Sequence, residues 1–206
     1  MRILTACLTL AGICSLFAGC IPESEQPLSD ISEAQQDAAL HGVWTLTDER
    51  GNVQYLHIGA EAEMPLGSTA AEPEAGLMRF WLVTLEANTG RVAKPFGMRF
   101  FATQIGDDSY ANAVMPFENQ PQTADTTYWF IKYEVDGDDL KLWGINQDAV
   151  AGAIDVGQLQ GTVEREDGRV QKVLLTDSSE RIAAYLRDGG DAALFPDRPG
   201  VYHRVR

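Results

Sequence analysis

The sequence is poor in cysteine and in positive charge, and both shortages exclude classes of protein. Its 206 residues contain three cysteines, all within the first twenty positions, and 16 Lys and Arg residues against 30 Asp and Glu residues. Beyond residue 20 there is no cysteine to form a disulfide, a nucleophile or a metal ligand, so the fold depends on its core alone. The formal net charge of -14 argues against a nucleic-acid partner.

Sequence signatures of enzymes and metal sites are missing as well. We find no nucleophile elbow, no zinc-protease motif and no phosphate-binding loop. His41, His57 and His203 do not have the spacing of metal ligands, and the acidic residues 136–139 are typical of a hairpin turn rather than of a calcium loop. We therefore expect no catalytic residue, no metal and no cofactor, while a carboxylate pair for glycoside hydrolysis stays open because the fold sets its spacing.

The first twenty residues are typical of an export signal. Arg2 precedes an uncharged, apolar run over residues 3–19 that is short for a membrane span. The run ends in Leu16-Phe17-Ala18-Gly19-Cys20, which resembles the lipobox of bacterial lipoproteins, with Phe17 where that family usually has Leu. The resemblance implies cleavage after Gly19 and attachment of diacylglycerol to the Cys20 sulfur. An uncleaved anchor and a plain signal peptide are the alternatives.

The predicted lipid sets the expected location of the protein. Acyl chains on Cys20 tie a protein to a membrane because each buried methylene contributes about 0.8 kcal/mol. Isoleucine, rather than aspartate, follows Cys20, which by resemblance to enterobacterial lipoproteins favours the outer membrane, with the protein facing the periplasm. Residues 20–40 contain Pro22 and Pro27 and have little to bury, which predicts a flexible tether, with a short helix over residues 30–40 as the alternative to further tether.

Beyond residue 40, apolar segments alternate with turn residues and predict β-hairpins. The clearest hairpin joins residues 128–135 to 140–145. A helix is predicted after Asp177 and a last strand over residues 201–206, while residues 59–75 and most of 107–126 are predicted as loops. This order predicts a mainly β fold, an antiparallel up-and-down β-barrel whose last strand pairs with its first, with one C-terminal helix before the last strand.

Gly42-Val43-Trp44, at the start of the first predicted strand, is similar to the G-x-W motif of the lipocalins and the wider calycin group. The resemblance implies a lipocalin-like barrel over residues 41–206, with the tryptophan at its closed end beneath an arginine. The family's arginine near the end of the penultimate strand is absent, since Thr176-Asp177 stands there. Arg204, on the last strand, is the candidate to cover Trp44 through a cation–π contact. The C-terminal segment also looks like the tail of uncharacterised bacterial lipoproteins.

Two functions remain open. In the first, the barrel holds a fatty acid or lysolipid in an aromatic pocket, and an arginine meets the anionic head. The candidate ligand-binding residues are Arg79, Phe80, Arg99, Phe100, Trp129 and Tyr133. In the second, side chains fill the barrel, and the acidic surface or the long loops dock a protein of the cell envelope, which predicts an exposed apolar patch. A hydrolase of the cell envelope is a third hypothesis, which no sequence motif supports.

Overall fold

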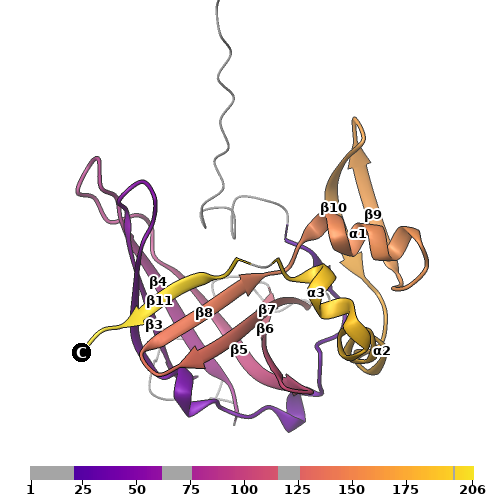
Figure 1. Ribbon diagram of the computed structural model, residues 1–206, viewed down its shortest axis with the longest axis horizontal. Coiled ribbons are helices and arrows are strands. Elements are labelled where there is room, and N and C mark those ends of the chain that lie inside the picture. The colour runs from indigo at the N-terminus through magenta and orange to yellow at the C-terminus, as the bar shows by residue number, and fades with distance from the viewer. Residues whose placement is uncertain (1–20, 62–75, 116–125, 197) are drawn as a thin grey trace, which may run out of the picture.

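Short alternating segments form the strands of a β-barrel, as the sequence predicts (Figure 1). The computed structural model describes residues 21–61, 76–115, 126–196 and 198–206. Eight antiparallel strands form the barrel. They are β2 (Gly42–Thr47), β3 (Val53–Ala60), β4 (Met78–Leu85), β5 (Phe96–Ile105), β6 (Asp108–Met115), β7 (Thr127–Asp136), β8 (Asp139–Gly144) and β11 (Gly200–Arg204).

Two pairings close the ring. The last strand, β11, lies between β8 and the first barrel strand, β2, and β6 pairs with β7 over most of its length. Closure removes the exposed edges of the sheet. β6 lies within residues 107–126, most of which the sequence predicts as loop, because hydrogen bonding to both β5 and β7 stabilises a segment whose own sequence signal is weak.

The β7–β8 hairpin is the one most clearly predicted from sequence, and it is confirmed. Asp136 pairs with Asp139, and Gly137 between them has a φ of 60°, which glycine adopts without the steric strain of a side chain. The acidic residues of this turn therefore serve a hairpin connection.

A side module packs on the outer face of β6 and β7. It comprises α1 (Gln147–Asp155), β9 (Gly161–Glu166), β10 (Arg169–Leu175), α2 (Ser179–Tyr185), η5 (Leu186–Gly190) and α3 (Asp191–Leu194). Its core joins Tyr110 and Phe130 of the barrel wall to Val150, Leu175 and Ile182 of the module. The sequence predicts a hairpin of residues 162–165 and 170–176 around the turn 166–169, and β9 and β10 form it. Its second strand was expected to be the penultimate strand of the barrel, but the hairpin lies beside the barrel rather than in its wall. Within the described ranges, no helix is long and apolar enough to cross a membrane.

Residues 21–40 form an ordered strap, which corrects the expected flexible tether. The strap contains the two-residue strand β1 (Glu23–Ser24) and the 3-10 turns η2 (Ile31–Glu33) and η3 (Ala38–Leu40), not the expected helix. Leu28 is only 3% exposed, and its N–H donates to Asn112 Oδ1 over 2.7 Å. The strap has few apolar residues, which misled the prediction, because much of its binding comes from backbone hydrogen bonds to strands distant in sequence.

Candidate functional site

The inner wall of the barrel carries a continuous apolar surface. Strand residues alternate between the two faces of a sheet, so every second residue of the barrel strands points inward. The buried inward set is Leu40, Trp44, Leu46, Leu56, Ile58, Met78, Phe80, Met98, Phe100, Ala111, Ala113, Tyr133, Leu140 and Tyr202. The two ends of this wall differ, and that difference defines the candidate site.

One end of the barrel, called here the sealed end, is closed by Trp44 and Arg204. Trp44 is 0% exposed, and its indole N–H donates to the Leu40 carbonyl over 2.8 Å. The guanidinium carbon of Arg204 lies 4.0 Å from the centre of the Trp44 ring, which is the contact expected from the last strand. The same guanidinium donates to the carbonyls of His41 and Ala39 over 2.7 and 2.9 Å. The arginine thus covers the tryptophan and binds the chain that leads into it.

Gly42 belongs to the same arrangement. Its φ is +136°, and a Cβ atom there would lie 2.8 Å from Nη1 of Arg204. Only glycine fits this backbone conformation and this close approach without displacing the arginine. The spacing of Gly42 and Trp44 therefore has a physical cause in the seal.

Two buried tyrosines of the barrel interior have hydrogen-bond partners. The Tyr133 hydroxyl donates to Asp37 Oδ2 over 2.9 Å, and the Tyr202 hydroxyl donates to Gln54 Oε1 over 2.6 Å. Burial, together with the nearby Asp37 carboxylate, raises the pKa of Tyr133 well above its ordinary value of 10.0. These hydrogen bonds satisfy both buried hydroxyl groups, so neither tyrosine offers an unpaired hydroxyl to a ligand.

The opposite end of the barrel, called here the mouth, has inward apolar side chains that are only half-buried. They lie in the second half of β4 and β8 and in the first half of β5 and β7. The mouth residues are Leu82, Phe96, Trp129, Ile131 and Leu142. Below them, Phe80 lies between two rings, with its centroid 5.9 Å from that of Phe96 and 6.0 Å from that of Phe100. The mouth is therefore an aromatic and aliphatic surface that the described side chains leave partly uncovered.

The four aromatic candidates from the sequence all point into the barrel. Trp129 lies at the mouth, Phe80 and Phe100 follow at greater depth, and Tyr133 reaches Asp37 near the sealed end. Their common face follows from the two-residue period of the strands. Cys20, the candidate lipidation site, lies outside the described residues.

Arg79 and Arg99 correct the predicted ligand site, because both lie on the outside of the barrel. Each sits between inward-facing neighbours in its strand, so the two-residue period turns it outward, and the two pair with each other across β4 and β5. Arg79 Nη2 lies 2.9 Å and Arg99 Nε 2.6 Å from Oε1 of Glu61, a carboxylate whose side chain is only 4% exposed. These arginines form a structural ion-pair cluster, so neither meets the head of a ligand held inside the barrel.

Sequence reasoning missed most of the mouth. Leu82 lies on the same face of β4 as Phe80, but it is not among the candidate ligand-binding residues. Phe96 follows Pro95, which obscured the start of β5, and Leu142 lies in a short strand without aromatic residues. The register of the β4–β5 hairpin pairs Leu82 with Phe96. A prediction of that register from the sequence would have placed both residues on the inward face at the mouth.

A polar pocket of about 480 Å³ lies outside the barrel, between the start of α1 and the β9–β10 turn. Its lining residues are Asn146, Gln147, Asp148, Gly168, Arg169 and Val170. Asn146 already caps α1, since its side chain accepts from the N–H of Ala149. The described part of the chain contains no group of three or more His, Cys, Asp or Glu residues able to hold a metal ion.

The fold and the site together define a closed antiparallel β-barrel with one sealed end and one apolar mouth. No family model matches the chain, and no curated protein and no solved structure matches it either. Function must therefore be argued from the barrel itself.

Proposed function

We propose that this chain is an exported lipoprotein, anchored through Cys20, whose barrel binds a small amphipathic or hydrophobic ligand at its mouth. The observation that carries the proposal is the half-buried ring of Leu82, Phe96, Trp129, Ile131 and Leu142 above a fully buried interior. Covering apolar surface contributes about 25 cal/mol per Å², so a hydrocarbon chain gains free energy at this ring. Eight-stranded barrels have an interior that side chains can fill or that one small ligand can occupy.

The chemistry of the inner wall favours a single apolar tail, as in a fatty acid or a lysolipid. The basic residues expected at the head, Arg79 and Arg99, lie outside the barrel and pair with Glu61. A charged head that enters the interior would lose its hydration without gaining an ion pair from them, which is costly. The tail therefore occupies the mouth, and the head stays in water.

Two tryptophans provide a matched test of binding. Trp129 points inward at the mouth, whereas Trp81 lies on the outer face of β4 against Gly97, and both are half-buried. We expect Trp129→Ala to weaken binding of lysophosphatidylcholine by at least about tenfold, or 1.4 kcal/mol, and Trp81→Ala to leave it unchanged. Native mass spectrometry and titration calorimetry on residues 21–206 measure the affinity. Absence of binding by the unsubstituted protein contradicts the proposal.

The anchor is tested separately. Cells that express the full chain with labelled palmitate should incorporate label into the protein, and Cys20→Ala should abolish both the label and cleavage after Gly19. Fractionation of the envelope then distinguishes the outer membrane, which we propose, from the inner membrane. A soluble, unlabelled mature protein contradicts the lipoprotein assignment.

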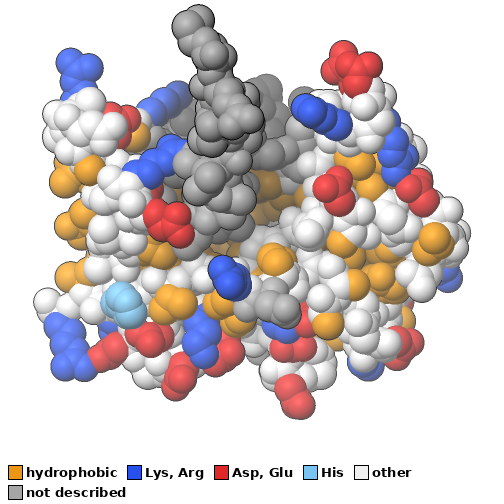
Figure 2. Space-filling view, turned by 45° about the horizontal axis from the view of Figure 1, so that its top comes forward, with side chains coloured by type: hydrophobic (Ala, Val, Ile, Leu, Met, Phe, Trp, Pro, Cys, Tyr) orange, Lys and Arg blue, Asp and Glu red, His pale blue; other side chains and the backbone are white. Residues whose placement is uncertain are grey.

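A specific surface favours a second candidate, a structural lipoprotein that docks a protein of the envelope. Apolar side chains lie on the outer faces of β2, β3 and β4, called here the flank, which is the left side of the view in Figure 2. Tyr55 is 42% exposed and Leu85 36% exposed there, and half-buried Val83, which pairs with Tyr55, and Trp81 continue the same outer face of β4. If this candidate holds, Tyr55→Ser and Leu85→Ser abolish capture of an envelope protein, while Trp129→Ala does not.

A further inference from the structure

The strap is fixed to the barrel on the mouth side. In β1, Ser24 pairs with Tyr128 near the start of β7, directly beside Trp129. The Thr127 hydroxyl donates to Glu23 Oε2 over 3.1 Å, and the N–H of Glu25 donates to the Leu175 carbonyl over 2.9 Å. Ser24 is 0% exposed. The chain therefore joins the barrel at the mouth and leaves no free spacer after Glu23.

From β1 the strap runs down the outer wall toward the sealed end. Leu28 is bound by Asn112 of β6, and the Ser29 hydroxyl lies 2.6 Å from that of Thr103 on β5. Asp37 then reaches Tyr133, and Leu40 reaches Trp44. The strap therefore begins at the mouth and ends at the sealed end, one barrel length away. Its first residues are thus close to the mouth and far from the sealed end.

This geometry limits the distance between the mouth and the predicted anchor. Cys20 immediately precedes Ile21, and a trans peptide bond places consecutive Cα atoms about 3.8 Å apart. Even fully extended, the few residues before Ser24 span only about 14 Å. An acyl group on Cys20 therefore holds the mouth side of the barrel close to the membrane surface.

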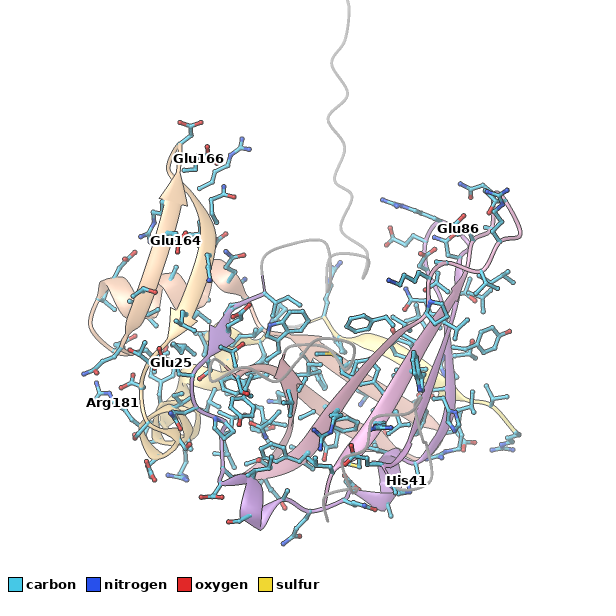
Figure 3. The ribbon with its side chains drawn as sticks, turned by 180° about the vertical axis from the view of Figure 1, so that it is seen from behind. Glu25, His41, Glu86, Glu164, Glu166 and Arg181 are labelled. Carbon is cyan, nitrogen blue, oxygen red and sulfur yellow. The ribbon has the colours of Figure 1, made fainter. Side chains whose placement is uncertain are left out.

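The mouth side also has a shape suited to lipid headgroups. Figure 3 shows two hairpins that rise on this side, with Glu86 on one and Glu166 at the tip of the other, while His41 lies toward the opposite, sealed end. The raised turns carry charges of both signs on exposed residues, among them Arg91, Arg169 and Glu166. Polar tips of mixed charge suit the zwitterionic headgroup layer, and the apolar mouth lies between them.

We propose that the mouth faces the bilayer that holds the anchor, and that the barrel takes its ligand directly from that lipid surface. This inference rests on the acylation of Cys20 in the proposed function and adds the orientation and the source of the ligand. A lipid tail then passes from bilayer to barrel without crossing bulk water, which avoids exposing its hydrocarbon.

Labelled cysteines test the orientation in the full acylated chain. Exposed turn residues provide two mouth-side positions, Asn88→Cys and Glu166→Cys, and two sealed-end controls, Asp107→Cys and Asp136→Cys. Each variant carries an environment-sensitive fluorophore and is reconstituted into phosphatidylcholine vesicles with a nitroxide on the headgroup. We expect the mouth-side labels to lose most of their fluorescence and the sealed-end labels to retain it. Equal loss, or greater loss at the sealed end, overturns the orientation.

A linker variant tests whether the strap causes the orientation. A Gly/Ser insertion of about ten residues between Cys20 and Ile21 spans on the order of 17 Å as a random coil, and it should remove most of the difference between the two pairs of labels. Flotation of the vesicles distinguishes a failure of the anchor from a failure of the orientation. A chain that does not float lacks the anchor, which overturns the anchor and the orientation together. A chain that floats and binds lysolipid but shows no mouth-side quenching overturns the orientation alone.

Discussion

The two ends of the barrel are built from the same alternating strands, yet one is a satisfied core and the other is not. At the sealed end, Trp44 is fully buried, its N–H is bonded, and Arg204 covers its ring. At the mouth, Trp129 and Leu82 also point inward but are only half-buried. An apolar side chain that is buried by its own chain contributes to folding, whereas one left partly uncovered is available to a ligand. The contrast predicts that substitutions at the two ends separate stability from binding.

The largest effect is expected at Trp44. Trp44→Ala removes the largest side chain of the seal and leaves a cavity in a packed interior, which should lower the free energy of unfolding by about 4 kcal/mol. Urea denaturation followed by far-UV circular dichroism measures it. An unfolding free energy within about 0.5 kcal/mol of the native value, which is the usual range for a surface substitution, would show that the seal is not a stability element.

Arg204 comes next. Arg204→Met keeps much of the side-chain volume but removes the cation–π contact and two hydrogen bonds to backbone carbonyls, a loss of about 2 kcal/mol. Arg206→Met is the matched control, because Arg206 is exposed on the same strand end and surface ion pairs contribute little. Equal losses in the two variants would contradict the role of the seal.

Tyr133 predicts the response to alkaline pH. The pKa of Tyr133 is higher in the folded protein than in the unfolded chain. Its contribution to the free energy of unfolding is therefore fully present below the ordinary tyrosine pKa of 10.0 and is lost as the pH rises above it. The pKa of Tyr110 is raised as well, by burial and by the Asp191 carboxylate, and acts in the same direction. We expect unfolding free energy to fall above pH 10, less steeply in Tyr133→Phe. Urea titrations at several pH values test this, and identical slopes would refute it.

The smallest effect on stability is expected at the mouth. Leu82→Ala removes half-buried surface and should lower the unfolding free energy by only about 1 kcal/mol, while weakening lysolipid binding by about tenfold. Leu85→Ala, on the outer face of the same strand, should alter neither quantity. If Leu82→Ala destabilises the protein as much as Trp44→Ala does, the mouth is part of the structural core and the contrast between the ends fails.

Local patterns predicted the features that depend on neighbouring residues in sequence. The β7–β8 hairpin follows from alternating apolar residues around Asp136 and Gly137, and the inward face of Trp129 and Tyr133 follows from the strand period. The contact of Trp44 with Arg204 needed one further step, the pairing of the last strand with the first.

The failures arose where contacts distant in sequence decide the outcome. Arg79 and Arg99 were read as ligand contacts by residue type, although the strand period turns them toward Glu61. The strap was read as a tether because few of its residues are apolar, but its backbone bonds to β7 and β10 were not visible in its own sequence.

By itself, the sequence determined the alternation that makes strands, the turns that join them and the residue types available to the inner wall, because these depend on interactions over a few residues. Only the tertiary structure decided that β11 closes the ring, that β9 and β10 lie outside it, and that the strap begins at the mouth. Those outcomes depend on which backbone edges and apolar faces meet after the chain has folded. Contacts between distant segments therefore determine which end of the barrel is left partly uncovered, and this determines where the candidate site lies.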